Sequence, residues 1–207
     1  HIGSFIAIVT YFHKEIYNFI ENKLLFLKIF ISSIPVMIMG YILVKYNIID
    51  ELRNIKIIAF ATLIFGALLY ISDKYKLQNN IEHNFTFKSA IIIGVFQVLS
   101  LIPGVSRSGI TITAARLLNF NRLDSAKISF LLSIPTLGAV SIFGIQEIIN
   151  SPNIGFSILN IVTIFFSFIF SLITIKYFLK FVKNFSLKYF VIYRIFLGFV
   201  LIILAYL

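Results

Sequence analysis

The stretch that decides the fold reads SAIIIGVFQVLSLIPGVSRSGITITAARLL, residues 89–118. Its two flanks are apolar enough for a membrane interior, but residues 103–108, Pro-Gly-Val-Ser-Arg-Ser, interrupt them. The 14 residues before the break would reach only about 21 Å as a helix and the 12 after it about 18 Å. Neither covers a hydrocarbon core of about 30 Å, and a proline interrupts a continuous helix. The stretch therefore predicts a re-entrant hairpin, two half-helices joined by a turn at depth.

Composition places the rest of the chain in the membrane as well. The chain has 207 residues, of which 59% are hydrophobic and 13% charged, and no soluble domain of this size is so apolar. We expect an all-α, polytopic membrane protein forming a single domain over residues 1–207. The apolar runs that predict its helices are Ile2–Phe12, Leu24–Val44, Ile55–Ile71, Ser89–Ile102, Arg107–Leu118, Ile128–Ile145, Ile154–Ile175 and Tyr189–Leu207.

The net charge of +10 is spread between the apolar runs, which favours membrane lipids as partners and argues against nucleic acid. If the hairpin returns to its starting side, four basic groups share one face: Lys14, Lys23 and Lys28; Lys74, Lys76 and Lys88; Arg116, Arg122 and Lys127; Lys176, Lys180, Lys183 and Lys188. The segment 147–155 and the C-terminus then share the other face, with Lys45, Arg53 and Lys56 as the exception. The positive-inside rule favours this re-entrant arrangement, with the basic face in the cytoplasm.

The interrupted segment has the chemistry of an anion site. Irregular backbone at membrane depth must be buried in protein or line a watery cavity. A half-helix beginning near Ser106 would present free N–H groups and a positive dipole end there. Arg107 adds a planar fork of donors for phosphate oxygens, Ser108 and Thr111 add hydroxyls, and Gln97 adds an amide. Together they predict a phosphate cradle within the membrane.

Each of these residues also has a plainer explanation. Ser106 could act only as the helix N-cap, Thr111 could bond back to its own helix, and Gln97 could link helices. Arg107 could form a structural ion pair, although arginine inside a membrane is by default functional. Arg194, early in the last apolar run, is explained as well by snorkelling as by function.

Two features outside the hairpin complete the pattern. We interpret Arg116 and Lys127 as part of a basic cytoplasmic edge, with Arg116 only reaching the interface. The tripeptide Ser-Ile-Pro occurs at residues 33–35 and 133–135, and inverted repeats are common in folds with broken helices.

The motif PGVSRSGITIT, residues 103–113, resembles the signature Pro-Gly-x-Ser-Arg-Ser-x-x-Thr of the bacterial undecaprenyl-diphosphate phosphatases, the bacitracin-resistance family. GVFQVLSLIPG before it, RLDSAKISFLLSIP after it and VIYRIF near the end are similar to that family too, so the resemblance covers nearly the whole chain. It implies inverted repeats with two re-entrant hairpins in the bacterial plasma membrane, with an active site opening to the outer face. The implied reaction converts undecaprenyl diphosphate to undecaprenyl phosphate and inorganic phosphate, which recycles a carrier for cell-wall synthesis.

The same resemblance implies roles for individual residues: Ser106, Arg107 and Thr111 in catalysis, and Gly104, Ser108 and Gln97 in substrate binding. Whether Ser106 is the nucleophile or an orienting donor stays open. A divalent cation, Ca²⁺ or Mg²⁺, and a homodimer are further expectations. The acidic and histidine elements of the family's other hairpin do not occur here, so the metal ligands stay unassigned. Lys127 also stands where relatives often have glutamate.

The opening HIGSFIAIV resembles a run that follows those elements, and we therefore expect an N-terminal segment to be missing and this chain alone to have little activity. A rival hypothesis is a transporter or flippase for polyprenyl phosphates, or a protein that binds diphosphate without hydrolysis. Broken helices and anion-binding half-helix ends also occur in transporters. Acidic and histidine elements upstream would favour hydrolysis.

Overall fold

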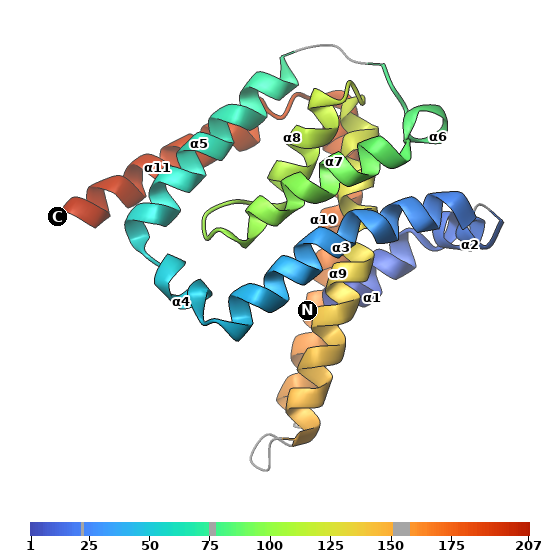
Figure 1. Ribbon diagram of the computed structural model, residues 1–207, viewed down its shortest axis with the longest axis horizontal. Coiled ribbons are helices and arrows are strands. Elements are labelled where there is room, and N and C mark those ends of the chain that lie inside the picture. The colour runs from blue at the N-terminus through green and yellow to red at the C-terminus, as the bar shows by residue number, and fades with distance from the viewer. Residues whose placement is uncertain (22, 75–77, 151–157) are drawn as a thin grey trace.

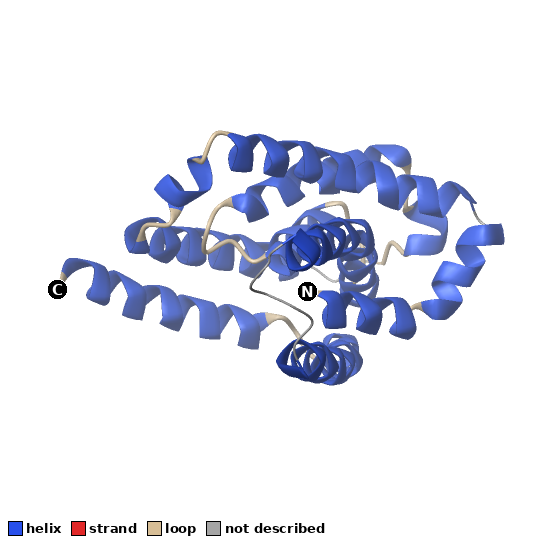
Figure 2. Cartoon of the chain, turned by 90° about the horizontal axis from the view of Figure 1, so that it is seen from below, coloured by secondary structure: helices blue, strands red, loops and turns tan. Residues whose placement is uncertain are grey.

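A computed structural model describes residues 1–21, 23–74, 78–150 and 158–207 of the chain. Every regular element in this part is a helix (Figures 1 and 2). The main helices are α1 (Ile2–Tyr11), α2 (His13–Glu21), α3 (Lys23–Lys45), α5 (Ile55–Asp73), α7 (Phe87–Val98), α8 (Arg107–Leu117), α9 (Arg122–Asn150), α10 (Ile158–Asn184) and α11 (Lys188–Tyr206). Short helices α4 (Ile48–Leu52), α6 (Ile81–Asn84) and the 3₁₀ turn η1 (Leu99–Leu101) lie between them.

Five helices of the described chain are long and apolar enough to cross a membrane, namely α3, α5, α9, α10 and α11. Their outer faces carry many exposed large apolar side chains, as expected where lipid replaces water as the solvent. The prediction of an all-α, polytopic membrane protein is confirmed.

The interrupted stretch folds as two half-helices. Thr86 caps α7 by accepting the Ser89 N–H at 3.2 Å, and α7 passes through η1 into an irregular turn. Helix α8 then begins at Arg107, with Ser106 as its N-cap. The break falls where Pro103 lacks a backbone donor and Gly104 adopts a φ of +92°. The predicted pair of half-helices is therefore present at the predicted position.

The two ends of this hairpin lie side by side (Figure 1). Asn79, before α6, donates its N–H to the carbonyl of Asn119 at 3.1 Å, and Asn121 donates its N–H to the carbonyl of Asn79 at 2.9 Å. Asn119 has a φ of +70°, a conformation that asparagine tolerates and that turns the chain at the end of α8. The chain thus leaves the hairpin at the level where it entered, as a re-entrant element must.

Contacts between helix ends test the charge pattern. Lys28 donates to the carbonyl of Phe85 at 2.6 Å, which joins the first basic group to the second. Asp73 pairs with Arg122 and also accepts the N–H of Leu187 at 3.0 Å, which joins the second group to the third and fourth. At the opposite end the Lys56 ammonium lies 4.4 Å from the ring centre of Tyr206, near the C-terminus. Lys76 and residues 151–155 of the opposite face lie outside the described residues. The described members of the four basic groups share one end of the helices, as the sequence predicts.

Helices approach closely where residues are small. A Cβ on Gly94 of α7 would lie 2.3 Å from the carbonyl oxygen of Ser32 in α3, and the Ser32 hydroxyl donates to the carbonyl of Ala90 at 2.8 Å. Small residues at crossings are typical of membrane helices. Ser33, in the first Ser-Ile-Pro, donates to the carbonyl of Leu132, which precedes the second copy, at 3.3 Å. The two copies therefore meet where α3 crosses α9, while the inverted repeat itself stays a prediction.

Candidate active site

The tip of the hairpin is fixed by helices α5 and α11. A Cβ on Gly104 would lie 2.4 Å from the carbonyl oxygen of Ile58 in α5, so only glycine allows this approach and this φ. The carbonyl oxygen of Gly104 accepts two hydrogen bonds, from the Thr62 hydroxyl at 3.3 Å and from Nη2 of Arg194 at 2.6 Å. Gly104 therefore shapes the turn through its backbone. The contact between Gly104 and substrate, which the family resemblance implies, stays a prediction.

Ser106 is the N-cap of α8, as its position in the sequence predicts. Its Oγ accepts the N–H of Gly109 at 3.2 Å and lies 3.2 Å from the Oγ of Ser108. Both hydroxyls are half-buried at the end of α8 where the positive pole of the helix lies. The cap orders the first turn of the half-helix, and the pair of hydroxyls gives that end further groups able to donate to an anion.

Arg107 contacts helix α9 through one arm only. Its Nη1 donates to the Thr136 hydroxyl at 2.9 Å, and it forms no ion pair with any carboxylate in the described part of the chain. The structural ion pair that could explain an intramembrane arginine is therefore not seen among these residues. The other N–H groups of the guanidinium remain available to a ligand, and the fork suits two oxygens of one phosphate.

Thr111 lies in the interface between α8 and α9. Its side chain is 1% exposed, and its hydroxyl oxygen lies within hydrogen-bond distance of the Ser129 hydroxyl, at 2.7 Å, and of the Arg107 carbonyl oxygen, at 2.9 Å. Thr111 therefore does bond back to its own helix, which was the alternative to a catalytic role. The hydroxyl holds α8 against α9 one turn from Arg107, and its catalytic assignment stays a prediction of the resemblance.

Gln97 is fully buried on α7, and its side-chain nitrogen and oxygen have no hydrogen-bond partner among the described residues. A buried polar group without a partner costs about 1–3 kcal/mol, so such groups need an explanation. The alternative to a substrate-binding role was that Gln97 links two helices, and its side chain forms no such hydrogen bond to a described residue. Its substrate-binding role stays a prediction.

Arg194 belongs to this site, although the sequence alone did not favour that over snorkelling. Besides its bond to Gly104, its guanidinium covers the first turn of α8, where a Cβ on Gly109 would lie 2.9 Å from Nη1. Its position in the sequence could have indicated this role. Arg194 is the seventh residue of a largely apolar 19-residue helix, so it lies deeper than the basic residues at the helix ends. Arg107 at the start of α8 and Arg194 on the Gly104 carbonyl therefore both belong to the tip.

Comparison with known proteins shows the family to which the chain belongs. The family model described as "Bacitracin resistance protein BacA" matches residues 1–200. The chain belongs to the BacA family. A protein named undecaprenyl-diphosphatase from Pelagibacter ubique is 46% identical over all 207 residues, which cover 80% of that relative. Proteins of the same name from a Jannaschia species and from Saccharophagus degradans are 34% and 36% identical, over 100% and 96% of this chain and 82% and 78% of theirs. The predicted family is confirmed.

In this BacA-family chain Arg116 is not the interfacial residue that the sequence predicted, and that prediction is wrong. It is 2% exposed, its Nη1 donates to the carbonyl of Phe120 at 2.9 Å, and its Nε lies 3.6 Å from Oδ1 of Asp73. Asp73 is itself 5% exposed and also accepts Nε of Arg122 at 2.6 Å. The carboxylate at the end of α5 draws Arg116 inward, and their separation of 43 positions hid the pairing from a local search of the sequence.

The donors at the tip fit an anion and do not fit a divalent cation. No group of three or more His, Asp or Glu side chains able to hold a metal occurs within the described residues. Hydroxyls, the positive end of α8 and two guanidinium groups surround the turn instead, and fixed positive charge disfavours a cation beside it.

Proposed function

We propose that this chain acts as an undecaprenyl-diphosphatase, as the names of its relatives indicate. In this reaction water adds to the terminal phosphorus of undecaprenyl diphosphate and the bond to the bridging oxygen breaks. The products are undecaprenyl phosphate, the lipid carrier, and inorganic phosphate. The observation that carries the proposal is the guanidinium of Arg107 at the capped start of α8, held by one arm and unpaired with any described carboxylate.

The diphosphate would lie against the first turn of α8, with the lipid tail among the helices. The free arm of Arg107 would bind two oxygens of the terminal phosphate and stabilise the negative charge that develops on them in the transition state. Arg194 would position the turn by holding the Gly104 carbonyl, while its charge adds to the positive potential there. These two arginines thus have distinct roles, one on the reacting phosphate and one on the loop that presents it.

Ser106 is better suited to orienting than to attacking. A serine nucleophile needs a neighbouring base, and the described residues place no histidine or carboxylate in hydrogen bond with its Oγ. The hydroxyl accepts the N–H of Gly109 and shares a hydrogen bond with the Ser108 hydroxyl, and a bound phosphate oxygen would take the hydrogen that this pair leaves over. We therefore assign Ser106 and Ser108 as hydroxyl donors to the bound diphosphate.

The site would open toward the outer face of the bacterial plasma membrane. The tip contacts Ile58, the fourth residue of α5, whose first turn lies at the end opposite the basic groups. Arg107 reaches Thr136, which lies 14 residues, or about 21 Å, along α9 from its basic start. Because basic ends face the cytoplasm, this depth supports a phosphate site in the outer half of the membrane.

Two parts of the proposal rest on the family resemblance. A divalent cation, Ca²⁺ or Mg²⁺, is expected from the resemblance alone, since the described residues supply no carboxylate cluster for it, and no step is assigned to it. A homodimer likewise rests on the resemblance.

The deciding experiment measures phosphate release from undecaprenyl diphosphate by the protein reconstituted in lipid, with and without a chelator, in wild-type and Arg107→Lys forms. Release that depends on Arg107 supports the proposal. Tight binding of undecaprenyl diphosphate without release of phosphate, by protein that includes any segment preceding His1, would contradict it.

A further inference from the structure

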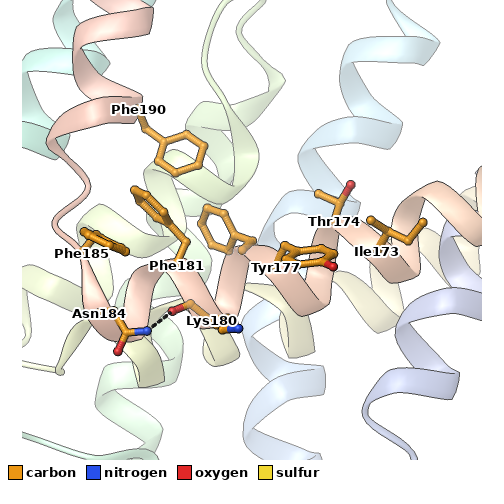
Figure 3. A pocket seen from close by; sticks show the side chains of 9 residues that line it. Ile173, Thr174, Tyr177, Lys180, Phe181, Asn184, Phe185 and Phe190 are labelled. Atoms are coloured by element: carbon orange, nitrogen blue, oxygen red, sulfur yellow. Dashed lines mark hydrogen bonds between the residues drawn. The ribbon is translucent and has the colours of Figure 1, made fainter.

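A groove of about 600 Å³ runs along the last three turns of α10 where α11 begins. The two helices are joined by a short turn and diverge from it (Figure 1). Figure 3 shows Phe190 of α11 facing Phe181 of α10, with Lys180 and Asn184 along the edge away from Phe190. The volume is typical of a ligand pocket.

Aromatic rings form the floor of this groove. Phe190 meets Phe178 and Phe181 edge-to-face, with ring centres 5.2 and 5.7 Å apart, and Phe181 stacks on Phe185 at 5.1 Å. Edge-to-face and offset contacts at these distances stabilise the rings as a cluster. The floor is therefore preformed, while Tyr177 and Phe185 remain 63% and 53% exposed. A preformed apolar floor open to lipid suits an acyl chain.

Charge is concentrated on one edge of the groove. Lys180 lines it, and at about 100° per residue Lys176 and Lys183 fall on the same stripe of α10. All three side chains are exposed. No Asp or Glu follows Glu147 in the sequence, so neither α10 nor α11 carries a carboxylate to neutralise them. Asp73, which accepts the N–H of Leu187 between α10 and α11, is already paired with two arginines.

We propose that this groove binds one anionic phospholipid from the leaflet at the basic face, the cytoplasmic leaflet by the positive-inside rule. An acyl chain lies on the rings of Phe181 and Phe190, and the phosphate lies at Lys180 beside the amide of Asn184. Basic pockets between helices on the cytoplasmic side select anionic headgroups through such charge. The polyprenyl substrate fits less well, because its diphosphate belongs at the hairpin tip and would leave the lysine edge without a partner.

The protein contains no tryptophan, so a single Phe190→Trp substitution reports on this groove alone. The protein is reconstituted into phosphatidylcholine vesicles that contain either brominated phosphatidylglycerol or brominated phosphatidylcholine, and quenching by the two lipids is compared. Since one lysine near a membrane surface contributes about 1 kcal/mol to anionic lipid binding, we expect phosphatidylglycerol to be preferred about fivefold. Equal quenching by the two lipids would overturn the proposal.

Two controls separate the groove from general attraction to the basic face. Phe26→Trp places the reporter at a similar depth, at the basic start of α3, on a side chain that is 50% exposed. We expect no more than a slight preference there. Adding Lys180→Gln to Phe190→Trp should remove most of the preference, whereas Lys14→Gln, at another exposed lysine of the same face, should leave it.

Three results would contradict the assignment. The first is equal phosphatidylglycerol preference at Phe26→Trp and Phe190→Trp. The second is an equal loss with Lys14→Gln and Lys180→Gln. The third is relief of quenching by small amounts of undecaprenyl phosphate, which would make the groove a substrate site. A preference that survives all three tests and weakens with added salt, as exposed charge pairs do, supports an anionic lipid site.

Discussion

Helix α8 carries two arginines nine residues apart whose surroundings differ in one respect. Arg116, at its end, is buried against the carboxylate of Asp73, while the guanidinium of Arg107, at its start, forms one hydrogen bond within the described chain, to the Thr136 hydroxyl. A buried cation that is paired with an acid is neutralised and holds the fold together. An arginine that is held in place without an acid among the described residues keeps its positive charge available to a bound anion. Here that anion is the diphosphate of the proposed substrate. We therefore assign a structural role to Arg116 and a substrate-binding role to Arg107.

The largest effect is expected at the paired end. Arg116→Ala empties the site of a large buried side chain and removes one of the two arginines that pair with Asp73, so the free energy of unfolding should fall by about 3–5 kcal/mol. Thermal or denaturant unfolding in detergent measures this loss. The Asp73→Ala, Arg116→Ala double variant should lose less than the sum of the single variants, by about 0.5–3 kcal/mol, because the two residues share one interaction. Wild-type stability of Arg116→Ala would show that the pair is not structural.

At the unpaired end the expected loss is in catalysis. Arg107→Lys keeps the charge but cannot present a planar fork, so kcat should fall about a hundred- to thousandfold, or about 2.7–4 kcal/mol, with KM less affected. Phosphate release and unfolding are measured on the same preparation, and stability should be close to wild type. Arg53→Lys, at an exposed arginine two residues before α5, is the matched control and should be fully active. A normal kcat for Arg107→Lys would remove it from the reaction.

The sequence predicts the features of α8 that depend on neighbouring residues. It does not predict those that depend on partners far away in the sequence. The hairpin was predictable because Pro103–Gly104 and the short half-helices are local features, and Ser106 follows from ordinary capping preferences. Arg116 was misjudged because its partner, Asp73, lies 43 positions away. Arg194 was undervalued for the same reason, since its acceptor, the Gly104 carbonyl, is 90 positions distant.

The loop that presents Arg107 gives a smaller effect. Gly104→Ala forces a side chain into a φ of +92° and toward the carbonyl of Ile58, so the tip must shift, at a cost of about 1–3 kcal/mol. We expect lower stability together with lower kcat, because the displaced turn misplaces the start of α8. Gly144→Ala is the control, since a Cβ there meets nothing within 4 Å. Equal behaviour of the two alanine variants would show that the tip is not closely packed.

The smallest effect distinguishes the two possible roles of Ser106. Ser106→Ala removes the cap of α8, which is typically worth about 1 kcal/mol, or about fivefold in an equilibrium or a rate. Ser106→Asn is the informative variant, because asparagine caps a helix as well as serine and its amide donates hydrogen bonds, yet it cannot form a phosphoserine. If Ser106 orients the phosphate, Asn should restore most of the phosphate release that Ala loses, and the stability lost with the cap should return with it. If Ser106 is the nucleophile, both variants should be inactive even where Asn restores stability, and no orienting role could account for that result.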